Sequence, residues 1–160
     1  MAVLMSFKLK DLQEIAEAKA KEYGKEKDYD CLPTTLLAIN DALKEVDDVN
    51  YADQSVLKAA SSLSMGFGAY DAPCGAVTAG SIAIGLKYGT SDVGDQATSA
   101  YARRRSREWM EWFKYYRYGS YNCFDLRGKP PVFDNCVSFC AQSAAKLVDI
   151  LTEGNPKVVH

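Results

Sequence analysis

Apolar residues recur at three- and four-residue spacing along most of this chain, and no segment alternates apolar and polar residues over a sustained stretch. The first spacing places apolar side chains on one face of an α-helix, whereas alternation is typical of half-buried strands. A chain of 160 residues can build one sizeable hydrophobic core but not two ordinary domains. We therefore expect an all-α fold over residues 1–160, a compact single-domain bundle of about five to six helices.

Glycine, proline and capping residues mark where these helices should begin and end. Gly24 is expected to stop the first helix, Gly119 the longest one, and Gly154 the last. The breaker Gly128-Lys129-Pro130-Pro131 separates the last two helices. The predicted helices run from Phe7 to Tyr23, from about Pro33 through Leu43, from Asp53 to about Leu63, from Gly75 to Tyr88, from Asp92 to Tyr118, and from Asp134 as N-cap to Glu153.

The predicted helix from Gly75 to Tyr88 is rich in small residues, and an irregular stretch from Met65 to Pro73 precedes it. Each glycine inside a helix costs about 1 kcal/mol relative to alanine. A close approach of another backbone, or a bulky group beside the helix, would offset this cost. The small-residue face could pack within the chain or across the symmetric interface of a homodimer.

The composition excludes several classes of protein. Hydrophobic residues make up 48% and charged residues 25%, as in folded proteins. The net charge of −2 argues against a surface that binds nucleic acid. No apolar run reaches the ~18 residues of a membrane span. The apolar start, Met1 to Ser6, lacks a basic segment and is too short for a signal peptide, so we expect a cytoplasmic protein.

Five cysteines and a single histidine, His160, limit the chemistry. In a reducing compartment cysteines serve in packing, catalysis or metal binding more often than in structural disulfides. An odd count also prevents complete pairing within one chain. Because the only histidine is the last residue, we expect neither a Ser–His or Cys–His catalytic pair nor a classical zinc site that uses histidine. Because Cys-x-x-Cys-His does not occur, we expect no c-type haem.

Three cysteines fall at predicted helix starts: Cys31, Cys74 and Cys136. Free N–H groups and the helix dipole there favour an anion and lower the pKa of a thiol, as nucleophilic and metal-binding cysteines require. Cys123 lies in the loop after the longest helix. Cys140 lies four residues after Cys136, so the two can share a helix face. Any single cysteine can simply pack as a small hydrophobe, and we keep that interpretation for Cys140.

Several segments follow, in order, a known cysteine pattern. They are Asp30-Cys31-Leu32, Met65-Gly66-Phe67-Gly68, Cys74-Gly75-Ala76-Val77-Thr78-Ala79-Gly80, Gly85-Leu86-Lys87-Tyr88-Gly89, Tyr118-Gly119-Ser120-Tyr121-Asn122-Cys123, and Cys136. Together they resemble the redox-active protein family named for the pattern C_GCAxxG_C_C. The resemblance covers about Asp30 to Leu151 and leaves the N-terminal helix, about residues 7–24, outside. Two departures are Pro73, where the pattern has glycine, and the displaced alanine and glycine after Cys74.

The resemblance implies a small helical protein whose relatives include the cysteine-bearing part of split-Soret cytochromes, where iron–sulfur binding is implicated. It implies Cys31, Cys74, Cys123 and Cys136 as the functional set, with Cys140 as an extra thiol or substitute ligand. The leading hypothesis is therefore an iron–sulfur cluster of unassigned type, bound by these four thiolates. Such a protein would transfer electrons to a redox partner protein.

Two alternatives use the same cysteines. A cofactor-free thiol–disulfide oxidoreductase would be an enzyme, but the chain lacks Cys-x-x-Cys, and a bridge from Cys136 to Cys140 would distort its helix. A carrier of zinc or another metal is the second alternative. Whether the protein is an enzyme stays open at this point.

The segment from Tyr101 to Tyr121 interleaves arginines with aromatic residues, a pattern that can bind nucleic acid or a membrane surface. However, four of the aromatic residues fall on one helical face, as in an ordinary core stripe. They are Trp109, Trp112, Phe113 and Tyr116. We therefore expect a core-facing stripe and a solvated arginine face, paired with Glu108 and Glu111, rather than a nucleic-acid site.

Overall fold

The computed structural model describes residues 6–127 and 132–160, and helices dominate it. The only β-structure in these two ranges, apart from an isolated bridge, is a parallel pair of two-residue strands, β1 (Phe7–Lys8) with β2 (Val158–Val159). The prediction of an all-α fold is confirmed, with more and shorter helices than the five to six expected. The helices are α1 (Leu9–Lys21), α2 (Cys31–Leu43), α3 (Gln54–Ala60), α4 (Ser64–Ala69), α5 (Gly75–Tyr88), α6 (Gln96–Glu111), α7 (Cys123–Arg127) and α8 (Val132–Thr152).

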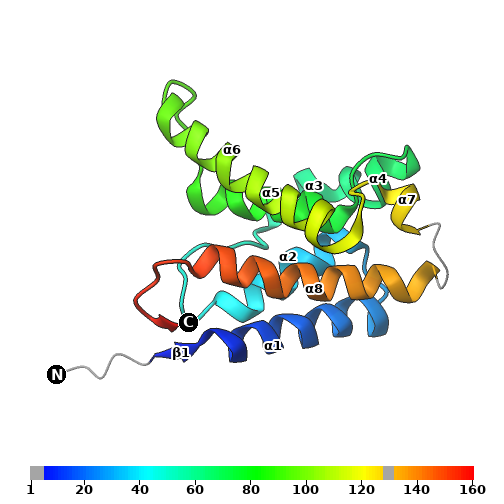
Figure 1. The fold of residues 1–160 in the computed structure, drawn as a ribbon, viewed down its shortest axis with the longest axis horizontal. Helices are drawn as coiled ribbons and strands as arrows, with labels where there is room; N and C mark the ends of the chain where they lie inside the picture. Colours follow the sequence, from blue (N-terminus) through cyan, green and yellow to red (C-terminus); the bar gives the residue numbers. More distant parts are fainter. Residues whose placement is uncertain (1–5, 128–131) are drawn as a thin grey trace.

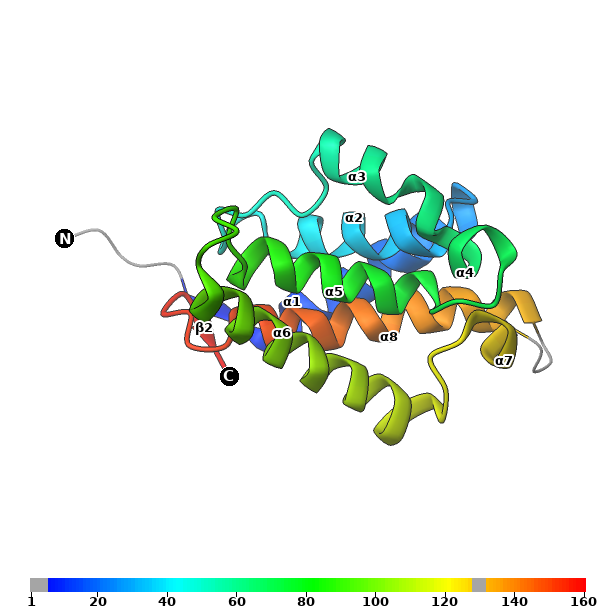
Figure 2. The ribbon, with the colours of Figure 1, turned by 90° about the horizontal axis from the view of Figure 1, so that it is seen from above.

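The first and last long helices are neighbours. Helix α1 packs along α8, and α2 contacts both of them. Helix α5 lies on α2 and carries α6 on its other side. The helices α2, α5 and α8 all begin at the same end of the bundle, where α1 and α6 finish (Figures 1 and 2). That end therefore collects three helix N-termini, whose dipoles favour negative charge.

The predicted bounds of α5 and the predicted start of α3 agree with the structure, whereas the start of α6 is displaced. Helix α5 spans Gly75–Tyr88 as predicted. Asp53 caps α3 as predicted, accepting a hydrogen bond from the Ser55 backbone N–H at 2.9 Å. Helix α6 begins later than predicted, because Asp95 rather than Asp92 caps it, by accepting from the Thr98 N–H at 3.0 Å.

Two predicted helix ends are wrong. Gly24 does not stop the first helix, since a π-helical turn (Glu22–Glu26) continues it; a Cβ at Gly24 would lie 3.2 Å from Cγ2 of Val137 on α8. Helix α8 begins at Val132, two residues before the predicted cap Asp134. Gly119 does end the segment after α6, a π-helical turn (Trp112–Tyr118), with φ of 76°. The breaker at residues 128–131 lies outside the described residues.

The small-residue face of α5 packs within the chain. A Cβ at Gly80 would overlap the indole ring of Trp109. The indole Nε1 donates a hydrogen bond to the Val77 carbonyl at 2.9 Å. The close approach expected from the sequence is therefore confirmed, although a side chain rather than a backbone makes it. Trp109 and Phe113 are fully buried, and Trp112 is partly buried against the core, which confirms the core stripe for these three residues. The side chain of Tyr116 lies outside the described residues.

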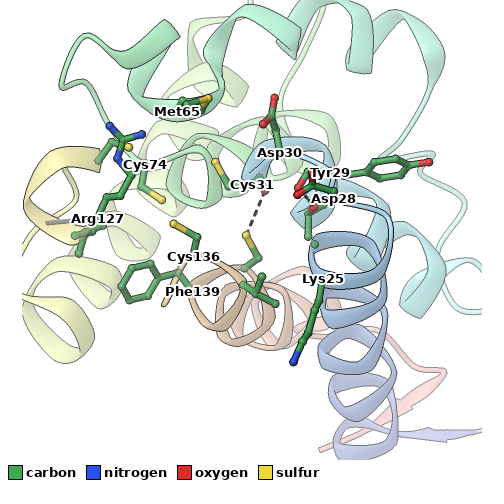
Figure 3. Close-up of a pocket in the computed structure, with 16 residues that line it drawn as sticks. Lys25, Asp28, Tyr29, Asp30, Cys31, Met65, Cys74, Arg127, Cys136 and Phe139 are labelled. Carbon is green, nitrogen blue, oxygen red and sulfur yellow. Dashed lines mark hydrogen bonds between the residues drawn. The ribbon is translucent and has the colours of Figure 1, made fainter. Parts of the chain in front are cut away.

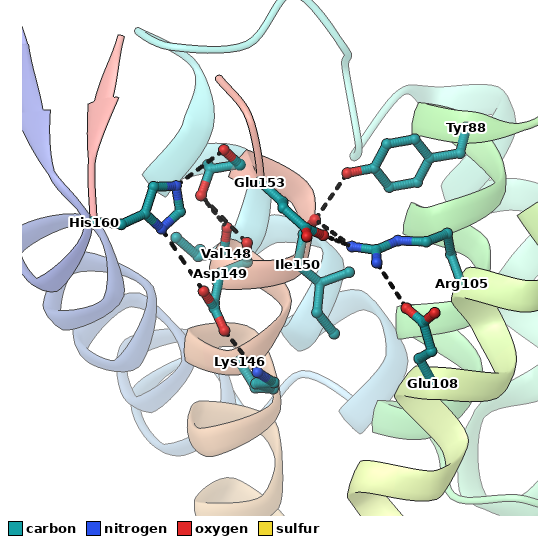
Figure 4. Close-up of polar contacts among 10 residues, drawn as sticks. Tyr88, Arg105, Glu108, Lys146, Val148, Asp149, Ile150, Glu153 and His160 are labelled. Carbon is teal, nitrogen blue, oxygen red and sulfur yellow. Dashed lines mark hydrogen bonds and ion pairs between the residues drawn. The ribbon is translucent and has the colours of Figure 1, made fainter. Parts of the chain in front are cut away.

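The arginine face of α6 is only partly solvated. Arg103, Arg104 and Arg107 are exposed as expected, but the side chain of Arg105 is only 12% exposed. Its guanidinium pairs with Glu108 at 2.7 Å and with Glu153, and donates to the Ile150 carbonyl at 3.3 Å. Figure 4 shows this group joining α6 to the end of α8. Arg105 is thus structural, contrary to the expectation of a wholly solvated arginine face.

Within residues 6–127 and 132–160, no helix has the length and apolar character that crossing a membrane requires.

Candidate cysteine site

All five cysteines line one cavity of about 350 Å³. It lies at the end of the bundle where α2, α5 and α8 begin. Figure 3 shows the side chains of Cys31, Cys74 and Cys136 around a common space, with Met65 and Arg127 at its margin. The four cysteines of the predicted set come from four different helices or helix caps, so tertiary packing alone brings them together.

Helix starts position two of the cysteines as the sequence indicated. Cys31 is the first residue of α2, and Cys74 is the N-cap of α5. Cys136 differs, because α8 begins four residues before it and places it one turn inside the helix. Cys123 was expected in a loop but is the first residue of the short helix α7. Cys136 and Cys140 both line the cavity from α8, so they share a helix face as predicted.

A short antiparallel bridge fixes Cys74 relative to Cys123. Pro73 pairs with Asn122. The Cys74 N–H donates to the Tyr121 carbonyl at 2.7 Å, and the Cys123 N–H donates to the Ala72 carbonyl at 3.0 Å. The two cysteines are 49 residues apart in sequence, yet backbone hydrogen bonds on both sides of the bridge hold them at the same wall of the cavity.

Helix α4 is mostly a left-handed turn. Residues 65–69 all have positive φ, including three that are not glycine: Met65 at 59°, Phe67 at 56° and Ala69 at 68°. A left-handed conformation costs a residue with a Cβ about 1–2 kcal/mol. At Gly66, φ of 68° and a would-be Cβ at 2.7 Å from Cβ of Cys123 leave room only for glycine. The sequence indicated an irregular stretch here, but only the structure shows its handedness.

The left-handed turn and α5 both direct backbone N–H groups at the sulfur of Cys31. The Met65 and Gly75 amides are hydrogen-bond donors to that sulfur. A Cβ at Gly75 would overlap the Cys31 sulfur, so a side chain at this position would block the amide's approach. Strained backbone is found where the surrounding structure holds it for a purpose; here the strained turn delivers one of the two amides.

The Cys31 thiol has the most acidic pKa of the cysteines in the cavity. Its pKa is lowered to about 6, first by a hydrogen bond from the Cys74 side chain. Burial opposes this effect, and the Met65 and Gly75 amides add to it. The pKa of Cys74 is raised, because its proton is held in the hydrogen bond to Cys31 and because the side chain is buried. The two thiols thus retain one proton between them, on Cys74, near neutral pH.

The other three thiols have a higher pKa than a free thiol, so each stays protonated to a higher pH. Burial is the main cause that raises the pKa of Cys123, Cys136 and Cys140. Of Cys31, Cys74 and Cys136, which were expected to have lowered pKa values, only Cys31 does, and the largest cause is the Cys74 side chain rather than the start of its own helix. At Cys74 the interaction with Cys31 and then burial raise the pKa, and Cys136 lies beyond the first turn of its helix.

Cys140 is the most buried of the five cysteines, with 2% of its surface exposed. Its thiol donates to the Cys31 carbonyl at 3.5 Å. Burial and this contact agree with the packing role that the sequence suggested.

Two basic residues line the cavity that sequence reasoning missed, Lys25 and Arg127. Lys25 lies in the π-helical turn after α1, and Arg127 is the last residue of α7. Neither belongs to a motif, so the sequence held no signal for them. In the described residues, no three His, Cys, Asp or Glu side chains converge closely enough to hold one metal ion.

The fold and the site together define a small helical protein with clustered cysteines at one end of its bundle. A family model described as "Putative redox-active protein (C_GCAxxG_C_C)" matches residues 29–150. The chain belongs to this family of redox-active proteins, and the resemblance seen in the sequence is confirmed. No curated protein and no solved structure matches the chain.

Proposed function

We propose that the cavity binds an iron–sulfur cluster through Cys31, Cys74, Cys123 and Cys136, and that the protein transfers electrons. The observation that carries the proposal is the convergence of all five cysteines on one cavity. Four thiolates are the usual ligand set of a cluster. When bound, the cluster would accept and release one electron at a time.

The donor set fits a cluster better than a single ion. A zinc ion needs its thiolates around one point, and the described side chains offer no such point. A cluster has several metal ions, so its thiolates lie further apart around a larger volume. The cavity of about 350 Å³ suits that arrangement, which favours the cluster over the zinc carrier.

The surroundings of the cavity suit an anionic group. Three helix N-termini meet at this end of the bundle, and Lys25 and Arg127 line the cavity. The amides of Met65 and Gly75 would remain hydrogen-bond donors to a coordinated Cys31 sulfur. Amide hydrogen bonds to the sulfurs are among the factors that set the potential of a cluster.

Anaerobic purification tests the proposal. We expect a brown protein with visible absorption, bound iron and acid-labile sulfide. The serine variants of Cys31, Cys74, Cys123 and Cys136 should each lose most of the iron. Cys140→Ser is the matched control, because it changes a thiol of the same cavity that we do not assign as a ligand, and it should keep its iron.

Two results would overturn the proposal. One is a colourless anaerobic protein that iron and sulfide cannot reconstitute. The other is stoichiometric zinc by elemental analysis, which would make the protein a metal carrier instead.

A further inference from the structure

We propose that the cluster-free protein forms a reversible disulfide between Cys31 and Cys74, giving the cavity a second, two-electron redox couple. The proposal concerns the same site; only its regulatory consequence, competition with the cluster, rests on the function proposed above. The chemical class of the oxidant is a low-molecular-weight disulfide.

The geometry selects this pair among the five cysteines. A Cβ on Gly75, the residue after Cys74, would overlap the Cys31 sulfur, and both thiols line the same cavity. The starts of α2 and α5 thus place the two thiols side by side, and Cys74 is the largest influence on the pKa of Cys31. Cys136 and Cys140 occupy successive turns of the regular helix α8, where a bridge would need distorted geometry.

Exposure assigns the two thiols different roles. Cys31 is half-buried and Cys74 is 6% exposed, and both line the cavity. Of these two thiols, a small disulfide entering the cavity therefore meets Cys31 first. Cys74 is shielded from that first attack but lies within reach of the sulfur on Cys31.

The reaction proceeds by two exchanges. The Cys31 thiolate attacks one sulfur of the small disulfide, forms a mixed disulfide and releases one small thiolate. Cys74 then attacks the Cys31 sulfur, the Cys31–Cys74 bond forms, and the second small thiol leaves. Two protein thiols are oxidised and one small disulfide is reduced to two thiols, which take up the two protons that the protein gives up.

This bond would remove two of the four proposed cluster ligands. Oxidised protein could not be loaded with a cluster until a thiol reduced the bond. The pair would thereby connect the thiol–disulfide balance of the surroundings to the occupancy of the cavity.

Peptide mapping of the cluster-free protein tests the pairing, with glutathione disulfide as the oxidant. Trypsin separates the cysteines cleanly. Residues 28–44 contain only Cys31, residues 59–87 only Cys74, and Cys123 falls on a third peptide. Cys136 and Cys140 share a fourth peptide, residues 128–146. We expect peptides 28–44 and 59–87 to appear joined, with the loss of two hydrogens, and to separate after reduction.

Variants check the order of the two steps. Cys74→Ala should stop the reaction with one glutathione on Cys31, whereas Cys140→Ser should form the link as the wild type does. A dominant link that joins any other cysteines, or an unlinked glutathione adduct at Cys31 of the wild type, would overturn the proposal. The wild-type map alone decides the pairing, so a poorly folding variant does not remove the test.

The two proposals fail separately. Iron and sulfide binding without the Cys31–Cys74 link would leave the cluster standing and reject the disulfide. A Cys31–Cys74 link in a protein that never binds iron would do the reverse.

Discussion

Cys31 concentrates more of the site's chemistry than any other residue. Its sulfur receives hydrogen bonds from the Cys74 side chain and from two backbone amides, and its carbonyl accepts bonds from the Thr35 hydroxyl at 2.8 Å and the Cys140 thiol at 3.5 Å. Hydrogen bonds thus fix both the side chain and the backbone carbonyl of Cys31. Hydrogen bonds of this kind stabilise negative charge on the Cys31 sulfur.

The pKa of Cys31 predicts how the thiol reacts with pH. An ordinary cysteine thiol has a pKa of about 8.5, whereas that of Cys31 is lowered to about 6. The thiolate therefore dominates above pH 6 and is lost as pH falls below it. In the cluster-free protein, alkylation of Cys31 by iodoacetamide should reach half its maximal rate near pH 6, measured on its tryptic peptide.

Cys74→Ala should move that midpoint upward, because it removes the hydrogen bond that lowers the pKa most. Cys140→Ser, which does not touch that bond, should leave the midpoint near its wild-type value. A midpoint near 8.5 in the wild type would contradict the hydrogen-bonded pair.

The contact between Gly75 and the Cys31 sulfur predicts how a substitution at Gly75 changes stability. Gly75→Ala places a methyl group on the Cys31 sulfur, and overpacking of this kind costs about 1–3 kcal/mol. Gly85→Ala is the matched control on the same helix, since no atom lies within 4 Å of its Cβ position. Gly85→Ala should raise the free energy of unfolding by up to about 1 kcal/mol, while Gly75→Ala should lower it. Urea denaturation of the two variants would measure both changes, and equal effects would contradict the contact.

At the scale of elements, the left-handed turn is the least expected part of the structure. Met65, Phe67 and Ala69 all adopt positive φ, which residues with a Cβ avoid. Met65 and Phe67 also leave large apolar side chains nearly half exposed. The turn gains a hydrogen bond to Cys31 and contact with α7 in return.

The two glycines of this turn provide a matched pair. Gly66 and Gly68 have similar positive φ, but only Gly66 lies against Cys123 and Ala72. Gly68→Ala should lower the free energy of unfolding by about 1–2 kcal/mol and leave iron binding intact. Gly66→Ala should lower it further, because the new methyl group meets Cβ of Cys123 at 2.7 Å. Iron content after anaerobic reconstitution should fall only for Gly66→Ala. Loss of iron in both variants would show that backbone strain in the turn, rather than the contact of Gly66 with Cys123, controls iron binding.

Sequence patterns predicted the elements whose causes are local. The extent of α5 and the cap at Asp53 follow from small residues, glycines and side-chain hydrogen bonds within one turn. The start of α8 and the continuation past Gly24 depend on contacts with distant helices, which no local pattern encodes. The sequence also indicated which cysteines to consider, but the bridge between Pro73 and Asn122 and the contact of Cys31 with Cys74 are tertiary.

At the scale of the whole molecule, the buried carboxylate of Asp47, far from the cysteines, connects the loop after α2 to the end of α5 through an ion pair with Lys87. The Asp47 carboxylate is 3% exposed and accepts hydrogen bonds from the Tyr51 hydroxyl at 2.5 Å and from Lys87 Nζ at 2.9 Å. Burial would raise the pKa of Asp47, but these partners and the Val49 N–H together lower it. The charged carboxylate is therefore part of the folded state.

Lys87→Met should lower the free energy of unfolding by roughly 2–3 kcal/mol, because it leaves a buried carboxylate without its cation. Lys58→Met, at an exposed position on α3, is the control and should change it little. Since the folded pKa of Asp47 lies below the unfolded one, this stabilisation is present above about pH 4. It is lost as pH falls further. Urea titrations at several pH values should show a smaller loss on acidification in Lys87→Met.

The packing of α1 against α8 has a consequence for how the protein is made in the cell. The proposed ligands extend from Cys31 to Cys136, and α1 packs against α8, the last helix, as well as against α2. A chain still emerging from the ribosome therefore has neither a closed core nor a complete set of thiolates until α8 is synthesised. Insertion of the proposed cluster would accordingly follow the synthesis of α8, and a nascent chain stalled before α8 should not bind iron.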